Sequence, residues 1–481
     1  MNVTILDCYT DEPSGLGVPP SLGTYPRYMA GSFEGKVTYL TIDDLRLYKK
    51  YSMKQLEPKI SQKTNISVHN LTKNIRDIKE ILDKTDTMYV ILGVHVPGKY
   101  LSATPGTLSE VIPMISDIKC EKILTGPAVF GTQLFGGKFA EKIDLKVFDR
   151  AENINEDYAK IAIDAVSGAQ ILKQIPDLRV IEIETARGCR FGKCSFCLEP
   201  IKHKLEFRER RDIVREMKAC YDLGARYFRL GKQSSFFSYP EMEELFKDIW
   251  RECPGIKVLH IDNVDPVEVT EDKTKIVAKY CTEGNIAAFG IESFDEEVVK
   301  ENTLNSSPNV SYRAIKIINK YGKERGENGM PRFLPGINIL FGLKGESKKT
   351  HEENMKWLQM LLDEELWFRR INIRQVALFE GTKLYQDAGD KFLRKNRKYY
   401  WKWRNEIRHK IDLPMLQKLV PKGAILRDVR AEIYDGNTTF ARQVGTYPLI
   451  VGIKGRLPLK QFYTIKITGH MLRSVTGEVV E

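Results

Sequence analysis

Three of the eight cysteines lie close together in the chain and could hold a metal centre. Cys189 and Cys194 are separated by four residues, and Cys194 and Cys197 by two. Three thiolates in one loop can hold three irons of a cubane iron–sulfur cluster. The fourth iron is then left open, where the amino and carboxylate groups of a bound molecule can chelate it. An electron passed from such a cluster into a bound sulfonium would cleave a carbon–sulfur bond.

Structural zinc is the alternative for the same residues. Zinc usually takes four Cys or His ligands in a closed tetrahedron, and His203, six residues after Cys197, is a possible fourth ligand. The context favours iron, because the loop lies between a predicted strand and a predicted helix and no second cysteine pair follows it. Cysteine is among the most commonly buried residue types, so we expect the remaining ones to pack in the core: Cys8, Cys120, Cys220, Cys253 and Cys281.

The elements around this loop repeat a strand followed by a helix from about residue 175 to residue 385. Short apolar runs predict six strands, at 180–184, 227–231, 257–262, 286–292, 336–343 and 371–378. Charged amphipathic stretches between them, such as 210–224 and 239–253, predict helices. Such a repeat indicates a partial (βα)6 barrel, whose active groups are expected at the carboxyl ends of the strands. The three cysteines follow the first of these strands.

With its aromatic Phe196 before the third cysteine, the loop resembles the radical S-adenosylmethionine (SAM) superfamily. The usual spacing there is three residues and then two, so the spacing of four and then two is a departure. Other segments strengthen the resemblance: 289–303, 339–347 and 377–385 are similar to the fourth-strand region, the "GLPGET" turn and the "PGTPLY" end of the methylthiotransferase-like branch. The resemblance covers about 180–390 and implies a four-iron, four-sulfur cluster, SAM as cofactor, and an electron donor such as ferredoxin or flavodoxin.

The same resemblance implies which residues hold the nucleotide. Gly231, Lys232 and Gln233 stand where a Gly-Gly-Glu-like edge commonly binds the methionine amino group, and Gln233 or backbone carbonyls suit that contact better than a lysine. A turn with a solvated lysine is the alternative. Glu292 ends the fourth strand, where a carboxylate could bond the ribose hydroxyls; pairing with a structural arginine is the alternative. Gly342, Gly345 and Glu346 form a turn after the fifth strand, which an ordinary turn explains equally well.

Residues 1–150 predict a separate α/β domain. Runs at 3–7, 88–94 and 122–126 are strand-like, and Gly- or Pro-rich loops follow them, which favours a Rossmann-like, doubly wound parallel sheet. This part resembles the cobalamin-binding domain that precedes many radical enzymes, so the loops at 15–24, 93–106 and 126–137 are expected to face the barrel mouth and bind a corrinoid. His95 and Gly98 are similar to a His-x-x-Gly cobalamin motif, although Gly93 stands where an Asp is expected; a hydrogen-bonded loop histidine is the alternative.

Two features near the C-terminus suggest RNA as partner. Residues 391–410 contain nine Lys or Arg and one Glu, with Tyr399, Tyr400, Trp401 and Trp403 interleaved. Cations neutralise phosphates and aromatic faces stack on bases; the alternative is an amphipathic helix whose aromatics pack on the barrel. Residues 431–481 predict a small β-barrel that resembles the TRAM module of tRNA methylthiotransferases through its strand rhythm. The candidate RNA-binding residues are Arg394, Lys395, Arg397, Lys398, Trp401, Trp403 and Arg442.

The domain organisation is therefore expected to be 1–150, 175–385, a basic helical linker at 386–430, and 431–481. As a whole, the chain resembles an archaeal family of iron–sulfur oxidoreductases through segments such as 16–28, 93–108, 228–239 and 441–453. Methylthiotransferases carry three cysteines for a second cluster in the N-terminal domain, but only Cys8 and Cys120 lie in this part.

The bulk properties fit a cytoplasmic enzyme. The 481 residues carry a net charge of +11, which favours a polyanionic partner. The sequence shows no signal peptide and no window with the roughly 20 apolar residues of a membrane span. We therefore expect a radical SAM transferase that modifies RNA, most simply tRNA. The rival hypotheses are the same chemistry on a lipid, metabolite or protein side chain, and a non-catalytic RNA-binding protein with a structural metal.

Overall fold

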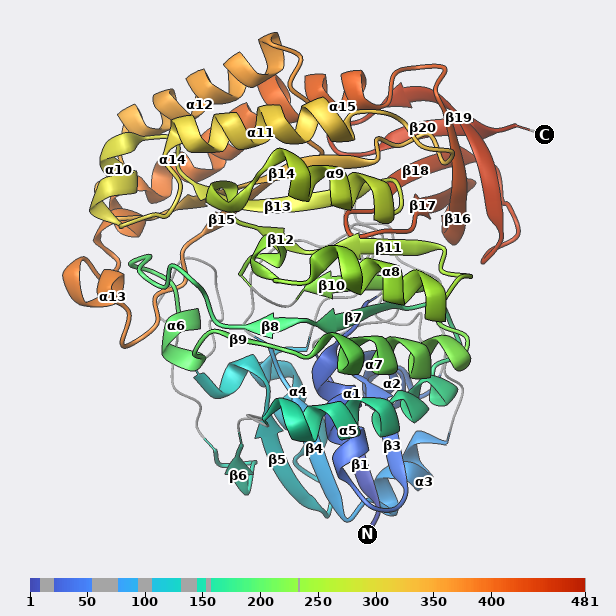
Figure 1. Ribbon diagram of the computed structural model, residues 1–481. Coiled ribbons are helices and arrows are strands. Elements are labelled where there is room, and N and C mark those ends of the chain that lie inside the picture. The colour runs from blue at the N-terminus through green and yellow to red at the C-terminus, as the bar shows by residue number, and fades with distance from the viewer. Residues whose placement is uncertain are drawn as a thin grey trace.

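The computed structural model of the chain describes residues 1–8, 21–53, 77–93, 106–130, 145–152, 157–231 and 234–480. Within these ranges, no helix is long and apolar enough to cross a membrane. Three parts follow one another in space: an N-terminal sheet, a curved wall of parallel strands, and a closed barrel of strands at the other extremity of the chain (Figure 1).

The N-terminal part is a parallel sheet whose strands are ordered β3-β1-β4-β5-β6. Its strands are β1 (Val3–Asp7), β3 (Val37–Thr41), β4 (Thr87–Ile91), β5 (Glu121–Thr125) and β6 (Arg150–Ala151). The accompanying helices are α1 (Thr24–Ser32), α2 (Ile42–Tyr51), α3 (Ile78–Asp83), α4 (Leu108–Ile115) and α5 (Tyr158–Gly168). Numbered within this sheet alone, the strands read 2-1-3-4-5, the flavodoxin-like order, so the order reverses between β1 and β4.

The central part consists of two parallel sheets, ordered β11-β10-β7-β2 and β12-β13-β14-β15. The first contains β2 (Ser21–Leu22), β7 (Val180–Glu184), β10 (Tyr227–Gly231) and β11 (Val258–Ile261). The second contains β12 (Asn263–Val264), β13 (Asn285–Glu292), β14 (Phe333–Phe341) and β15 (Ile371–Gln375). Only Asp262 separates β11 from β12, so the two sheets continue as one curved wall whose carboxyl ends share one edge.

Helices cover the outer side of this wall (Figure 1). They are α7 (Arg210–Asp222), α8 (Met242–Glu252), α9 (Glu271–Tyr280), α11 (Pro308–Gly322) and α12 (Lys348–Asp363). Two shorter helices, α6 (Glu199–Lys202) and α10 (Glu296–Glu301), lie beside the carboxyl ends of the strands. The largest apolar core lies between the strands and these helices, and includes Phe228, Phe246 and Phe289.

The C-terminal part begins with α13 (Lys383–Asp387), α14 (Lys391–Ile407), a π-helical turn η5 (Arg408–Asp412) and α15 (Leu413–Leu419). A closed barrel of order β16-β17-β18-β20-β19 follows. Its strands are β16 (Ile425–Asp435), β17 (Thr438–Gln443), β18 (Leu449–Lys454), β19 (Phe462–His470) and β20 (Val475–Val479). The barrel starts at Ile425, earlier than the expected residue 431, because the charged run 425–430 already pairs with β17 and β19.

The loop between β17 and β18 closes the amino ends of the central strands. Val444 packs with Val180 and Tyr227, the first residues of β7 and β10. The Thr446 hydroxyl lies 3.1 Å from Nδ1 of the buried His260 on β11, and Arg369, just before β15, donates to the carbonyl of Tyr447 (3.1 Å). The C-terminal barrel therefore sits at the opposite end of the strands from α6, α10 and α13 (Figure 1).

These arrangements confirm the predicted fold class: a parallel α/β N-terminal sheet, a partial barrel and a small closed β-barrel. Each of the six strands expected in the central part is present, and so are those at 3–7, 88–94 and 122–126. Strand β2 is not apparent from the sequence. It extends the central sheet beside β7 although it precedes α1 in the N-terminal part, and a two-residue strand has too few side chains to show a period.

Candidate active site

The cysteine loop lies between β8 (Ala186–Arg187) and β9 (Glu206–Phe207), which pair antiparallel directly after β7. This short hairpin returns the chain to the edge where the strands end, as a loop following the first strand of a parallel repeat must. Cys189, Cys194 and Cys197 are each half-buried there. By contrast, Cys8, Cys220, Cys253 and Cys281 are buried in apolar cores, and Cys120 lies half-buried beside β5.

Peptide N–H groups lie near the sulfurs of the loop. The N–H of Gly192 donates to Cys189 Sγ at 3.4 Å, and the N–H groups of Asn305 and Glu199 interact with the sulfurs of Cys194 and Cys197. Hydrogen bonds of this kind stabilise the negative charge of a ligating thiolate and tune a cluster's reduction potential. The loop therefore provides peptide donors that favour the thiolate form of its cysteines.

Two of the three thiols, those of Cys194 and Cys197, hold their protons more tightly than an exposed thiol does. Burial raises the pKa of Cys194 to about 12 and of Cys197 to about 11, with a further contribution from the neighbouring cysteines. A metal centre that binds here must displace these protons, which makes loading favour alkaline over acidic solution. The N–H groups supply part of the compensation for the burial of the resulting negative charge.

The arrangement suits a cluster better than a single zinc ion. Within the described ranges, no three His, Cys, Asp or Glu side chains converge as the ligands of one ion do. A cubane cluster does not need such convergence, because each thiolate binds a different iron. His203, the possible fourth zinc ligand, has its Nδ1 3.0 Å from Glu199 Oε1 and is engaged there.

The edge of β10 brings a glycine against an acidic side chain. Gly231 has φ of +155°, and a Cβ at this position would lie 2.2 Å from Cβ of Asp262. Only glycine lets the two strand ends approach this closely. Arg229, two residues earlier, forms ion pairs with Asp262 and with Glu182 on β7 (3.2 Å). Lys232 and Gln233 lie outside the described residues, so the predicted contact of Gln233 stays a prediction.

Glu292 stands on a strained backbone at the end of β13. Its φ is +64°, and the pairing of β13 with β14 shifts register between Phe289 and Glu292. Left-handed conformations of residues other than glycine are costly and are typical of functional sites. Burial raises the pKa of the Glu292 carboxyl to about 7, opposed by the charge of Arg374 on β15. Glu292 as a residue is partly buried at the strand end.

The turn after β14 is shaped by α14. The buried Glu346 accepts the N–H of Gly342 (2.7 Å) and an Nδ2–H of Asn396 on α14 (2.8 Å). A Cβ on Gly342 would lie 2.3 Å from Cδ2 of Leu393, so glycine at this position is required by packing against α14. Gly345 has φ of +85° and faces α10 at Glu301. Glu346 therefore locks the turn.

Phe196 is half-buried and packs against an apolar cluster that joins the cysteine loop to α10, α13 and α14. The cluster contains Val298, Leu304, Leu343, Leu378, Leu384 and Leu393. The aromatic side chain before the third cysteine therefore anchors the loop to elements that come more than a hundred residues later in the chain.

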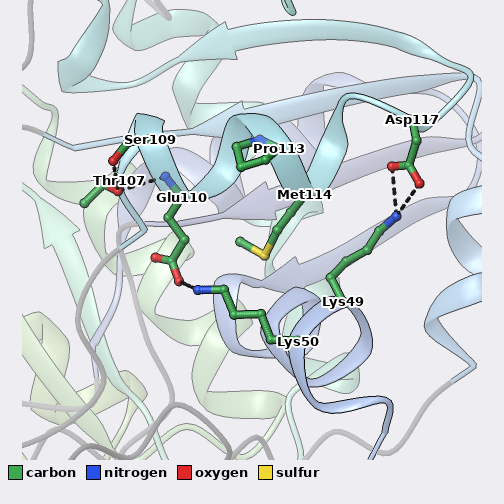
Figure 2. Close-up of a pocket in the computed structure, with 8 residues that line it drawn as sticks. All are labelled: Lys49, Lys50, Thr107, Ser109, Glu110, Pro113, Met114 and Asp117. Carbon is green, nitrogen blue, oxygen red and sulfur yellow. Dashed lines mark hydrogen bonds and ion pairs between the residues drawn. The ribbon is translucent and has the colours of Figure 1, made fainter.

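A groove of about 680 Å³ lies between α2 and α4 in the N-terminal part (Figure 2). Its charged side chains pair with one another, Lys49 with Asp117 (2.8 Å) and Lys50 with Glu110. None of the cysteine-loop residues lines this groove. His95 and Gly98 lie outside the described residues, so the predicted corrinoid contact of His95 stays a prediction.

Helix α14 has one buried and one exposed face. Two of the residues predicted to bind RNA, Trp403 on this helix and Arg442 on β17, are buried, which corrects the prediction for them. Trp403 is only 4% exposed and stacks between His351 (5.2 Å) and Tyr399 (5.3 Å), so it cannot stack on bases. Arg442 is fully buried and its Nε donates to Glu432 (3.0 Å). On the outer face, Trp401 is 63% exposed. The expected cations Arg394, Lys395, Arg397 and Lys398 are exposed as well.

The structure also identifies site residues that carry no signal in the sequence. Asn302 and Asn305 reach the cysteine loop from the segment after α10, and Asp262 closes on Gly231. These residues have no distinctive spacing in the chain, so nothing in the sequence marks them as part of the site.

Comparison with known proteins places the chain among radical enzymes. The family model of the Radical SAM superfamily matches residues 183–358. An uncharacterized protein of Archaeoglobus fulgidus is 39% identical over 99% of this chain and 90% of its own length. An uncharacterized protein of Methanocaldococcus jannaschii is 39% identical over 99% of this chain and 93% of its own length.

Among solved structures, the fold is similar to the radical S-adenosylmethionine methyltransferase TsrM from Kitasatospora setae, determined with cobalamin and a [4Fe-4S] cluster bound. The TM-score is 0.52 at 13% sequence identity, over 80% of this chain and 76% of that chain. At this identity the likeness is one of fold. Together with the cysteine loop and the two archaeal relatives, these matches show that the chain belongs to the radical SAM superfamily.

Proposed function

We propose that this protein modifies RNA, most simply tRNA, by methylation or a related replacement of a C–H hydrogen. The observation that carries the proposal is helix α14, whose outer face is cationic and holds the exposed Trp401. A helix of this kind beside the active edge of a radical SAM barrel offers a path for a polyanionic substrate.

Members of the radical SAM superfamily use a four-iron, four-sulfur cluster and SAM, and Cys189, Cys194 and Cys197 would hold the cluster here. When bound, the cluster supplies the electron that cleaves a carbon–sulfur bond of the sulfonium, while the protein supplies placement. The Glu292 carboxylate would accept hydrogen bonds from ribose hydroxyls, and the end of β10 at Gly231 would bound the methionine moiety. An electron donor is needed, for which a ferredoxin or flavodoxin is our expectation.

Helix α14 runs between the two ends of the central strands. At its start, Asn396 binds Glu346 in the turn at the carboxyl end of β14. At its finish, Arg408 in η5 donates to the carbonyl of Ile371 (2.7 Å), the first residue of β15. The helix has 17 residues, and at 1.5 Å per residue it spans roughly 25 Å. RNA bound along it could contact the C-terminal barrel and still reach the cysteine-loop edge.

The N-terminal sheet supports a corrinoid as a second cofactor. In flavodoxin-like sheets, ligands bind at the carboxyl ends of the strands where the order reverses, which here is between β1 and β4. The loops predicted to hold the corrinoid, at 15–24, 93–106 and 126–137, fall largely outside the described residues, and so does His95. Cys8 is fully buried against the side chains of the sheet's own core, so it is not a ligand. TsrM, which has a similar fold, was determined with cobalamin bound.

The proposal is tested by anaerobic reconstitution followed by incubation with SAM, a reductant and tRNA. We expect methyl transfer to depend on tRNA, and tRNA affinity to fall steeply with salt. The Trp401→Ala protein should lose affinity without losing thermal stability. Salt-independent or undetectable tRNA binding by a well-folded, cluster-loaded protein would contradict RNA as the substrate and favour a lipid, metabolite or protein substrate.

A further inference from the structure

Ser195, which lies between the second and third cysteines, is held on three sides by residues that are distant in sequence. It is 5% exposed. Its N–H donates to the carbonyl of Asn302 (2.9 Å), its hydroxyl donates to Asn302 Oδ1 (2.9 Å), and its carbonyl accepts the N–H of Leu384 on α13 (2.8 Å). Two of these three contacts come from Asn302.

Asn302 also binds the turn after β14. Its Nδ2 donates to the carbonyls of Val298 and Lys344, each at 2.8 Å, and its Oδ1 accepts the N–H of Lys344 (3.1 Å). The side chain is fully buried and both of its polar atoms are engaged. Asn302 therefore joins the cysteine loop, the end of α10 and the turn at Gly342–Glu346 through one amide group.

The segment after α10 also reaches Cys194 itself. Thr303 takes a left-handed conformation, with φ of +49°, which turns the chain directly after Asn302. Three residues after Asn302, the N–H of Asn305 interacts with the sulfur of Cys194. The Ser195–Asn302 contacts and the Cys194–Asn305 contact thus bring the same two segments together, so loosening the first pair must also loosen the second.

We infer that Asn302 is a positioning residue for the cluster: it fixes the cysteine loop at Ser195, next to Cys194, in register with the turn after β14. Hydrogen bonds to cluster sulfurs help to set the reduction potential, and partners of ligating residues affect retention of the metal. This role concerns the cluster that the superfamily shares and does not depend on the nature of the substrate.

The chain contains a matched control for this role. Asn319 on α11 has the same bonding pattern: its Nδ2 donates to the carbonyls of Ile315 and Trp367, each at 2.9 Å, and its Oδ1 accepts the N–H of Trp367 (2.7 Å). Like Asn302, it binds a carbonyl four residues earlier and bonds both the N–H and the carbonyl of a single distant residue. The difference is that these bonds of Asn319 do not reach the cysteine loop.

The experiment compares Asn302→Ala with Asn319→Ala after identical anaerobic reconstitution. We measure the melting temperature, iron and sulfide per chain, the midpoint potential, and the electron paramagnetic resonance spectrum of the reduced cluster with and without SAM. Both variants should melt earlier. Only Asn302→Ala should lose iron, shift the potential and alter the spectrum, and its cleavage of SAM should fall by about 10- to 100-fold, as is typical when an outer support of a metal site is removed.

Ser195→Ala keeps the inference testable if Asn302→Ala does not fold. It removes only the hydroxyl bond to Asn302 Oδ1, and we expect smaller changes in the same direction in potential and spectrum with full folding. A wild-type potential and spectrum for the folded Asn302→Ala protein, or for Ser195→Ala where Asn302→Ala fails to fold, would overturn the inference. The same changes in Asn319→Ala would also overturn it, since they would then reflect reduced stability alone.

Discussion

The cysteine loop and helix α14 both carry residues that stand out in the sequence, but the fold uses the two sets differently. The three cysteines of the loop are all half-buried there, with peptide N–H groups near their sulfurs. Helix α14 divides its residues instead: Trp401 faces solvent, while Trp403 is buried. A short loop can present all its reactive groups to one site, whereas a helix must turn every third or fourth residue toward its support.

Removing one thiol from the cysteine loop should have the largest effect. Cys194→Ala leaves two thiolates for a cluster that needs three, so we expect reductive cleavage of SAM to fall below detection in the reconstituted protein. Cys281→Ala removes a buried thiol elsewhere and should keep cleavage near the wild-type rate. The measurement is 5′-deoxyadenosine formed under anaerobic conditions. Normal production by the Cys194→Ala protein would contradict the assignment of the cluster ligands.

The two tryptophans of α14 should separate stability from binding. Trp403→Ala empties a buried site and should lower the free energy of unfolding by about 3–5 kcal/mol. Trp401→Ala should change it by less than about 0.5 kcal/mol, yet weaken RNA binding by about 1–3 kcal/mol if its ring stacks on a base. Denaturant unfolding and RNA titration on both variants check this. Equal decreases of stability in the two would show that the helix does not divide as described.

The cations of α14 should appear in the salt dependence of RNA affinity. Changing Arg394, Lys395, Arg397 and Lys398 together to Gln should flatten the log–log slope by about 0.7 for each single-strand phosphate that the helix no longer neutralises. The matched control changes four exposed cations of α7 and α9, namely Arg211, Arg215, Lys275 and Lys279, and should leave the slope unchanged. An equal flattening in both quadruple variants would show that α14 contributes no more to RNA binding than other positively charged parts of the surface.

A smaller effect concerns the C-terminal barrel, which is docked at the far end of α14. Burial lowers the pKa of His260 to about 4, below the value of about 6.5 that an unfolded histidine has. The unfolded chain therefore binds more protons as the pH falls, and stability decreases on acidification. Between pH 7 and pH 5 the decrease from this group is about 2 kcal/mol. His260→Gln should remove that share of the pH dependence; an unchanged profile would contradict the neutral, buried state of His260.

The sequence predicts strands and the cysteine site well for a physical reason. The parallel strands of the central part are largely buried, so they appear as apolar runs such as 286–289 and 339–341. The three cysteines are near neighbours in the chain, so their spacing survives folding. These features are local, and local patterns can be interpreted without knowledge of the tertiary contacts.

The parts that the sequence did not predict depend on distant contacts. Trp403 follows the inward positions Leu393, Asn396 and Tyr400 at helical spacing, but only the packing partners Phe341 and His351 decide which face is inward. The sequence suggests that Arg442 is a surface cation, but in the fold it is buried and donates to Glu432. Gly342 owes its small size to Leu393 rather than to the nucleotide. In each case the deciding neighbour lies on a different helix or strand.

The most direct test of the account follows a methyl-labelled SAM through the reconstituted enzyme with tRNA and, where required, cobalamin. It measures label in RNA and 5′-deoxyadenosine in the same reaction, for the wild-type protein, Cys194→Ala and the quadruple Gln variant of α14. We expect label in tRNA for the wild type, neither product for Cys194→Ala, and 5′-deoxyadenosine with little labelled RNA for the quadruple variant. Equal labelling of RNA by the wild-type and quadruple proteins, or 5′-deoxyadenosine without any modified RNA from the wild type, would contradict it.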